Sequence, residues 1–311
     1  MYGLGCVSVS QRLDVRKTYK LYIGGKFPRS ESGRSYAVTD AKGEFVANAS
    51  RASRKDARDA VMAARAAVPG WSGATPYNRG QVLYRVAEVM EGRAEQFAAE
   101  VAAGEGLRLS QARTAVSAAI DRWVWYAGWT DKLSQVVGGT NPVAGPYFNF
   151  SIPEATGVVA VLAPQDSSLL GLVSVVAPAL AGGNVVVAVS SQRRPLPAIT
   201  LAEALATSDV PGGVVNLLTG SAAEIGPWLA EHADVNAIDL TGVVGATEGD
   251  NAADAELARD LEAKAAGTLK RVRRPPLSVT QLDSPDWAAE PGLSRMTAFL
   301  ETKTVWHPIG V

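Results

Sequence analysis

The sequence predicts an α/β fold built on a doubly wound parallel sheet. Its second half contains four short apolar runs that are typical of strands: Val158–Leu162, Val185–Val189, Val214–Leu218 and Ala237–Leu240. Segments with helical spacing alternate with these runs, and this βαβα rhythm indicates parallel strands joined by helices. The runs show no clean alternation of polar and apolar residues, which indicates that helices cover both faces of the sheet.

The first part of the chain predicts a turn and then three helices. Apolar residues on both sides of Gly24-Gly25 predict two short strands over Tyr19–Phe27, joined by that turn. Apolar residues three and four apart then predict helices. These helices run from just after Ser53 to Val68, where Pro69-Gly70 would end the first, and over about Asn78–Ala103 and Ser110–Val136. The aromatic residues of the third, Trp123, Trp125, Tyr126 and Trp129, suit core and interface packing better than a ligand cage.

The remaining elements continue the pattern to the C-terminus. Two strands, Tyr147–Ile152 and Thr156–Leu162, are expected to join at Pro153-Glu154. Further helices are expected near Leu169–Leu180, Ala198–Ala206, Ala222–Glu231, Ala253–Ala266 and Leu293–Leu300, with strands at Leu269–Val272 and Thr302–Trp306. We therefore expect a flexible leader (1–18), an α/β domain (19–137 and 156–272), a β arm (138–155 with 292–311) and a proline-rich linker (273–291).

Composition excludes several classes of protein. With 47% hydrophobic and 20% charged residues, the chain has an ordinary globular composition. A net charge of −1 offers no electrostatic footprint for nucleic acid or an anionic membrane. The longest apolar run, from Thr156 to Ala163, is far shorter than the roughly 20 residues of a membrane helix. The single cysteine, Cys6, excludes an internal disulfide framework and fits a reducing compartment, so we expect a cytoplasmic protein.

Four strings resemble aldehyde dehydrogenases in order and spacing. They are Leu21–Gly25, Ala177–Asn184 (family APALAAGN), Pro211–Gly220 (family PPGVVNVVTG) and Glu301–Trp306 (family ETKTVW). The resemblance covers about Tyr19 to Val272 and again Gly292 to the end. It implies a Rossmann-like cofactor domain with an oligomerisation arm and, if any cofactor binds, NAD(P).

The resemblance also implies that the catalytic machinery is missing. In the family a catalytic domain with a cysteine nucleophile separates the strand that Thr268–Val272 resembles from the C-terminal strand. Here fewer than thirty residues separate them. The family's general-base glutamate aligns with about Pro275, which cannot transfer a proton, and Cys6 lies in the expected leader. We therefore expect no catalytic residues. His232 and His307 lack metal-ligand spacing, so we expect no metal site either.

Positions that would form the family's cofactor cleft have changed in character. The family's PWNF loop aligns with Pro164–Ser167, so that Asp166 replaces an asparagine that helps hold an oxyanion. Val189 and Gln192 align with a lysine and a glutamate that hold the adenosine ribose. Val243 replaces the serine of the phosphate-binding FTGS turn. The degenerate cleft positions are thus Pro164, Asp166, Val189, Gln192, Gly220, Thr241, Gly242 and Val243, and we expect no bound cofactor.

The retained arm suggests a partner. In the family the arm adds its strands to the catalytic-domain sheet of a neighbouring subunit, and open strand edges are otherwise prone to association. The expected interface residues are Tyr147, Phe148, Phe150, Thr302, Thr304 and Trp306.

Two functions remain open at this point. One is a non-catalytic subunit that stabilises or regulates a full-length aldehyde dehydrogenase, similar to the inactive half of double-length relatives. The other is an NAD(P)-dependent aldehyde oxidoreductase component that still binds its cofactor. A weaker third possibility is a protein that associates with itself and binds an unrelated ligand at the degenerate cofactor-cleft positions.

Overall fold

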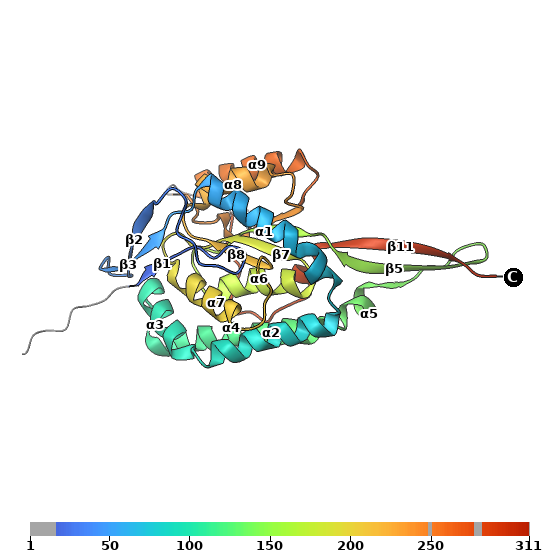
Figure 1. The fold of residues 1–311 in the computed structure, drawn as a ribbon, viewed down its shortest axis with the longest axis horizontal. Helices are drawn as coiled ribbons and strands as arrows, with labels where there is room; N and C mark the ends of the chain where they lie inside the picture. Colours follow the sequence, from blue (N-terminus) through green and yellow to red (C-terminus); the bar gives the residue numbers. More distant parts are fainter. Residues whose placement is uncertain (1–16, 248–250, 277–281, 311) are drawn as a thin grey trace, which may run out of the picture.

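A five-stranded parallel sheet forms the centre of the molecule (Figure 1). The computed structural model describes residues 17–247, 251–276 and 282–310, so Cys6 and most of the expected leader lie outside the described residues. The strands follow the order β10-β9-β6-β7-β8. They comprise β6 (Val158–Leu162), β7 (Val185–Val189), β8 (Val215–Leu218), β9 (Ala237–Asp239) and β10 (Arg271–Arg273). All neighbouring pairs are parallel, which confirms the predicted fold class.

Helices cover both faces of this sheet. One face carries α6 (Leu170–Ala181) and α7 (Leu196–Ala206), and the other carries α8 (Ala222–Glu231) and α9 (Asn251–Ala266) (Figure 1). Every residue of α6 is buried, because α6 lies between the sheet and two further helices, α2 (Pro76–Glu91) and α4 (Leu109–Trp129). β6 and β7 are likewise fully buried, which explains their continuous apolar runs.

The N-terminal part forms more helices than the three predicted. They are α1 (Arg54–Gly73), α2 (Pro76–Glu91), α3 (Ala94–Glu105), α4 (Leu109–Trp129) and α5 (Leu133–Val137). The predicted end of α1 at Pro69 was wrong. Pro69 is exposed, and the helix continues because Trp71 is buried and its indole N–H donates to the carbonyl of Leu180 at 3.1 Å. The other two predicted helices each divide, the second at Gly92 and the third at Thr130.

A small sheet that the sequence did not reveal packs beside α3 and α7. It consists of β1 (Thr18–Tyr19), β2 (Ser35–Thr39) and β3 (Phe45–Ser50), in the order β1-β3-β2. The predicted strand pair over 19–27 is reduced to a turn closed by hydrogen bonds between Ile23 and Lys26. Gly24 and Gly25 have φ values of 60° and 78°, which explains the glycine pair.

The arm is a separate antiparallel sheet that projects from the body (Figure 1). It contains β4 (Gly139–Thr140), β5 (Tyr147–Ala155) and β11 (Leu300–Pro308), and a short helix, α10 (Ser294–Thr297), precedes β11. The predicted break at Pro153-Glu154 was wrong, because both residues pair with β11. The chain turns into β6 at Gly157, whose φ of 127° favours glycine.

Asn184 anchors the root of the arm. Its side-chain carbonyl accepts the N–H of Gly157 at 2.9 Å, and its amide donates to the carbonyl of Phe299 at 2.9 Å. These two residues lie next to the arm-forming strands β5 and β11, and Asn184 itself is fully buried next to β7. A single side chain thus joins both long strands of the arm to the central sheet.

Candidate functional site

The carboxyl ends of β6, β7, β8 and β9 meet at one edge of the sheet, and the predicted site positions lie there. Open parallel sheets generally bind ligands at this edge. Pro164, Val189 and Thr241–Val243 are buried, whereas Gln192 is half-buried and Asp166 is exposed. The structure therefore brings the predicted positions together, at the end of β7 and in the turns that follow the strands.

The turns after β6 and β7 are bound to each other. Gln165 donates its side-chain amide to the carbonyl of Ala163 at 2.8 Å and accepts the backbone N–H of Gln192 at 3.1 Å. Arg194 donates to the carbonyl of Asp166 at 2.8 Å. The backbone N–H of Gln192 therefore already has a hydrogen-bond acceptor within the protein.

The turn after β9 is packed tightly against β6. Gly242 lies so close that an added Cβ would stand 2.1 Å from the carbonyl oxygen of Ala163. Thr241 donates its backbone N–H to the carboxylate of Asp239 at 2.8 Å. Only glycine fits here, and close packing alone explains it.

A carboxylate of the protein accepts hydrogen bonds from the backbone amides that follow this turn. Asp254, in the first turn of α9, accepts the N–H of Gly245 at 2.6 Å and that of Thr247 at 3.0 Å. Its side chain is buried. Backbone amides beside a helix N-terminus are groups that commonly hold a phosphate. In this chain an aspartate of the protein binds two of them.

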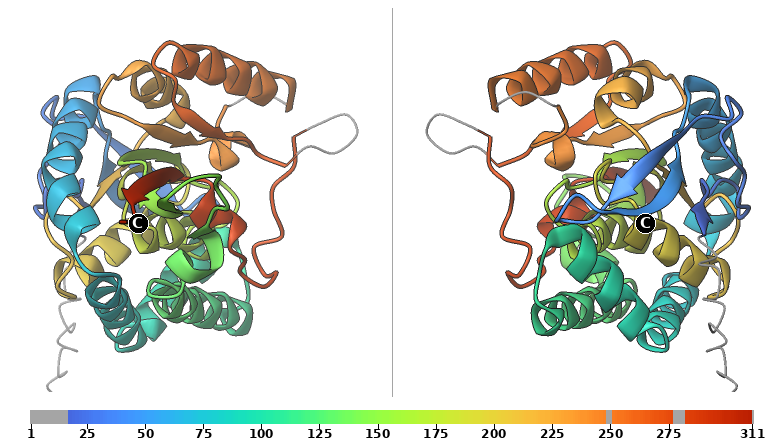
Figure 2. Two further views of the ribbon diagram at one scale, coloured as in Figure 1. Left: turned by 90° about the vertical axis from the view of Figure 1, so that its right-hand side faces the viewer. Right: turned by 90° about the vertical axis from the view of Figure 1, so that its left-hand side faces the viewer.

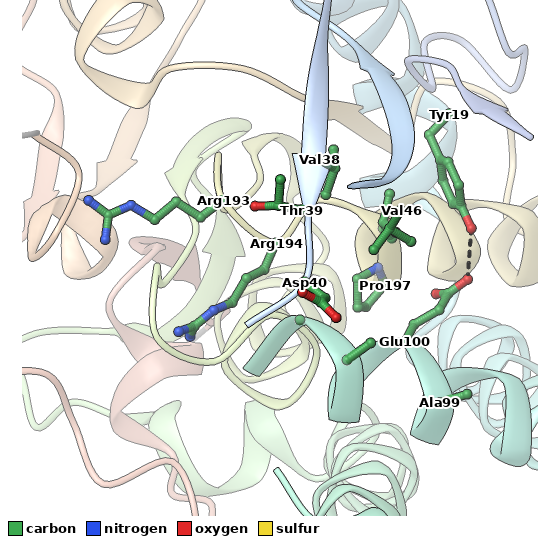
Figure 3. Close-up of a pocket in the computed structure, with 13 residues that line it drawn as sticks. Tyr19, Val38, Thr39, Asp40, Val46, Ala99, Glu100, Arg193, Arg194 and Pro197 are labelled. Atoms are coloured by element: carbon green, nitrogen blue, oxygen red, sulfur yellow. Dashed lines mark hydrogen bonds between the residues drawn. The ribbon is translucent and has the colours of Figure 1, made fainter. Parts of the chain in front are cut away.

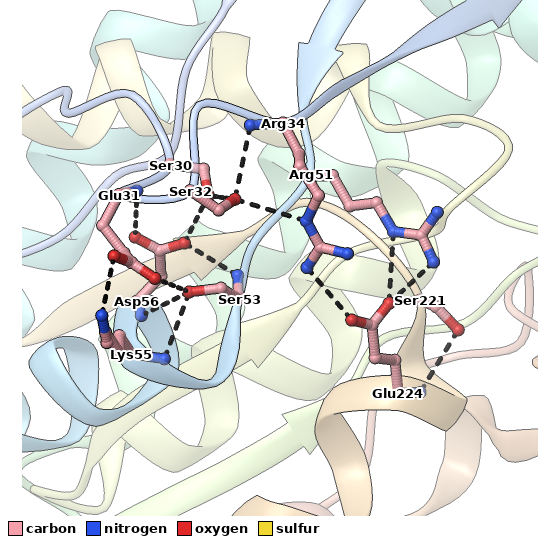
Figure 4. Close-up of polar contacts among 10 residues, drawn as sticks. All are labelled: Ser30, Glu31, Ser32, Arg34, Arg51, Ser53, Lys55, Asp56, Ser221 and Glu224. Atoms are coloured by element: carbon pink, nitrogen blue, oxygen red, sulfur yellow. Dashed lines mark hydrogen bonds and ion pairs between the residues drawn. The ribbon is translucent and has the colours of Figure 1, made fainter.

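Gly220 lies at the end of β8 and has a φ of 133°. An added Cβ would stand 3.4 Å from the backbone nitrogen of Ala52. The helix that follows, α8, has Glu224 in its first turn, and this carboxylate binds Arg51 at 2.7 Å and Arg34 at 3.2 Å (Figure 4). The hydrogen bond from Arg51 is the main factor that lowers the pKa of Glu224. Arg51 and Arg34 are therefore paired within the chain.

Residues 282–295, called the strap below, run along one side of the sheet from the region of α9 to α4 (Figure 2). Much of this segment falls within the expected linker, yet the side chains of Leu282 and Trp287 are buried. The indole N–H of Trp287 donates to the carboxylate of Asp166 at 3.2 Å. The strap therefore contacts the turn after β6 directly.

Two arginines hold the strap in place, of which Arg122 is buried and Arg295 is half-buried. Arg122 of α4 donates to the carbonyls of Trp287 at 2.5 Å and Ala289 at 2.6 Å. Arg295 stacks over the Trp287 ring at 5.3 Å and pairs with Asp239 of β9 at 3.4 Å. Burial lowers the pKa of both arginines. Sequence reasoning missed these residues, although a tryptophan inside a proline-rich segment was a usable signal.

The predicted interface residues lie together on the arm. Tyr147 and Trp306 form an edge-to-face pair with ring centroids 5.7 Å apart, and they are 42% and 58% exposed. Phe148 and Phe150 pack with each other, and their ring centroids are 5.4 Å apart. Thr304 shares a 2.9 Å hydrogen bond with Ser151, and Thr302 is exposed opposite Pro153.

Metal-binding clusters and membrane-spanning helices are both absent from the described residues. Within ranges 17–247, 251–276 and 282–310, no group of three or more histidine, cysteine, aspartate or glutamate residues could hold a metal ion. No helix among those same residues is long and apolar enough to cross a membrane.

Comparison with known proteins identifies the family. Residues 27–261 match the model of the aldehyde dehydrogenase family. The chain belongs to that family. It is 31% identical over 272 residues to the putative aldehyde dehydrogenase DhaS of Bacillus subtilis, covering 86% of this chain and 52% of that protein. It is 34% identical over 240 residues to mouse cytosolic 10-formyltetrahydrofolate dehydrogenase, covering 75% of this chain and 26% of that protein.

Solved structures of the family agree. An NAD⁺ complex of aldehyde dehydrogenase from Bacillus cereus superposes with a TM-score of 0.74 at 25% identity, covering 82% of this chain and 50% of that one. PnpE from Pseudomonas sp. WBC-3 gives the same TM-score at 28% identity, with 82% and 50% covered. The chain spans about half the length of the solved structures that it matches.

Proposed function

We propose that this aldehyde dehydrogenase family member is a non-catalytic subunit that binds a full-length aldehyde dehydrogenase through its arm. The observation that carries the proposal is the contact of Trp287 with Asp166. Asp166 aligns with the asparagine that assists catalysis in the family, and here the strap supplies it with an internal partner. The strap lies in the stretch of 26 residues between β10 and β11, and half of the matched Bacillus cereus enzyme has no counterpart in this chain.

The arm supplies the binding surface in this proposal. Among the described residues, β11 pairs only with β5, so its other edge can accept a strand. The aromatic side chains of Tyr147 and Trp306 are of the kind that anchor interfaces. Since the arm of a family member adds to a catalytic-domain sheet, a complete subunit offers a matching edge. Self-association through β11 is the competing arrangement.

We further propose that the chain has lost most of its affinity for NAD(P). Val189 and Val243 are buried apolar side chains where the family places ribose- and phosphate-binding groups. Asp254 already binds two nearby amides, and its carboxylate would repel a phosphate.

The alternative is an oxidoreductase component that keeps its cofactor. It is favoured by the intact parallel sheet and by the likeness to the Bacillus cereus enzyme, whose structure was solved as an NAD⁺ complex. Calorimetric titration with NAD⁺ separates the two proposals. A dissociation constant in the low micromolar range, on the order of −8 kcal/mol, would favour the alternative.

The subunit proposal is tested with a purified full-length aldehyde dehydrogenase from the same genome. The two proteins are mixed, and the mass of any complex is measured by size-exclusion chromatography with light scattering. We expect a mixed complex that is lost in Trp306→Ser and on deletion of 301–311. Tyr77→Ser, which changes another exposed aromatic residue on α2, is the matched control and should bind normally. A complex that survives the deletion, or one formed by this chain only with itself, contradicts the proposal.

A further inference from the structure

A cavity lies between the small sheet, α3 and the start of α7, next to the turn that follows β7 (Figure 3). Its volume is about 200 Å³. Most of its wall is apolar and comes from Val38, Val46, Ala99, Ala103 and Leu196. A small hydrophobic core that includes Tyr19, Val38 and Leu196 lies beneath it. Such a cavity favours a ligand with an apolar body.

One carboxylate oxygen in this cavity has no partner. Glu100 accepts hydrogen bonds at Oε1 from Tyr19 at 3.1 Å and from Thr200 at 2.8 Å. Its other oxygen, Oε2, is buried and has no hydrogen-bond partner among the described residues. In Figure 3 this second oxygen points away from Tyr19, towards the side of the cavity where Pro197 lies. A buried acceptor without a donor is unfavourable, so this oxygen can gain a hydrogen bond from a bound molecule.

The charged groups nearby are engaged elsewhere. Lys17 and Arg93 both pair with Glu203. The side chain of Asp40 accepts the backbone N–H of Lys42 and Glu44 in its own turn.

The two arginines at the rim of the cavity, Arg193 and Arg194, also form no ion pair with the carboxylate of Glu100. The guanidinium groups of Arg193 and Arg194 point away from Glu100 in Figure 3, and Arg194 binds the carbonyl of Asp166. Burial raises the pKa of Glu100, which indicates that its negative charge is poorly compensated.

We propose that this cavity binds a small organic ammonium compound, with its N–H on Oε2 of Glu100 and its apolar body against Val38, Val46 and Leu196. The hydrogen bond would be charge-assisted, and the carboxylate would repel acidic molecules of the same size. The volume lies below the range of about 300–1,000 Å³ of drug-sized sites, so the ligand is small. Benzylamine has the required ammonium group and a compact apolar ring.

The test is a set of calorimetric titrations of the full chain with benzylamine, benzyl alcohol and benzoate. We expect benzylamine to bind most tightly, benzyl alcohol more weakly and benzoate least. Glu100→Gln keeps the shape of the side chain but removes its negative charge. It should weaken benzylamine binding at least about tenfold. Glu95→Gln, on the same helix but paired with Arg113 at the surface, is the control and should bind as the unchanged chain does.

A second variant keeps the test informative if Glu100→Gln fails to fold. Ala103→Leu fills the cavity from an exposed position on α3 while leaving the carboxylate unchanged. It should abolish binding of both benzylamine and benzyl alcohol. The proposal is overturned if the unchanged chain binds no benzylamine, or if a folded Glu100→Gln or Ala103→Leu variant binds it with unchanged affinity.

Discussion

The indole nitrogen of Trp287 lies 3.2 Å from the carboxylate of Asp166, although the two residues are far apart in the sequence. The contact joins the strap to the turn after β6. Asp166 is therefore part of an internal hydrogen bond at the edge where parallel sheets bind ligands. The same contact makes the strap a stabilising element, with consequences that can be measured.

Replacing Trp287 should destabilise the fold. The side chain is only 8% exposed, so Trp287→Ala should lower the free energy of unfolding by about 3–5 kcal/mol. Trp287→Phe keeps an aromatic ring and should cost less. Urea denaturation followed by circular dichroism measures both. Trp306→Ala, at a side chain that is 58% exposed, should change stability by no more than about 0.5 kcal/mol. Equal effects at the two positions would show that the strap does not contribute to stability.

Gly242→Ala should be among the most destabilising glycine substitutions. The new Cβ would stand 2.1 Å from the carbonyl oxygen of Ala163, and backbone must move to relieve the overlap. We expect a loss of about 3 kcal/mol or more, measured by thermal denaturation. The control is Gly128→Ala in α4, where no atom lies within 4 Å of the added Cβ. Alanine favours helix there and should stabilise by roughly 0.5–1 kcal/mol.

Glu224→Gln should show a pH-dependent effect. Arg51, and then Arg34, lower the folded-state pKa of Glu224, so their pairing stabilises fully above the unfolded value of about 4.3. That stability is lost as pH falls through the lowered folded pKa. Because the carboxylate is 39% exposed, the loss at pH 7 should be at most about 1 kcal/mol.

Urea denaturation at neutral and at strongly acidic pH checks this pattern. The difference between Glu224→Gln and the unchanged chain should disappear in acid. The control variant Glu256→Gln, on the exposed face of α9, should show little effect at either pH. A difference that persists in acid would mean that the ion pairs are not its source.

The chain alone should not oxidise aldehydes with NAD⁺ or NADP⁺. Formation and hydrolysis of a thioester in this family require a cysteine nucleophile and a base. In the resemblance the base aligns with about Pro275, and Cys6 precedes the first strand. The absorbance of the reduced nicotinamide measures NADH or NADPH production, with a complete family member as the positive control. Turnover that disappears in Cys6→Ser would contradict this prediction.

Local patterns predicted the central sheet well. β7 and α8 have the predicted bounds, because an uninterrupted apolar run and a serine-capped helix carry their own signals. β2 and β3 were missed since Ser35–Thr39 is short and mixed in polarity, and it becomes a strand through pairing with Phe45–Ser50. Propensity alone is weak for such segments.

The candidate site was only partly predictable for a similar reason. Its turn residues could be placed from the strings that resemble the family. The contacts of Arg122 and Arg295 with the strap depend on residues far away in the chain, for which the sequence holds no local pattern. Trp71 shows the same effect, because its distant bond to Leu180 keeps α1 helical beyond Pro69.

The buried amide of Asn184 determines how the arm transmits force. Because it binds the chain beside β5 and beside β11 at one point, the two strands cannot pivot independently of the sheet. A force applied at the distal end of the arm, where Tyr147 pairs with Pro308, would be transmitted along the two strands to the start of β7. The arm would therefore behave as a rigid extension of the central sheet and not as a flexible linker. A partner bound at its distal end would be held in a fixed orientation relative to the sheet.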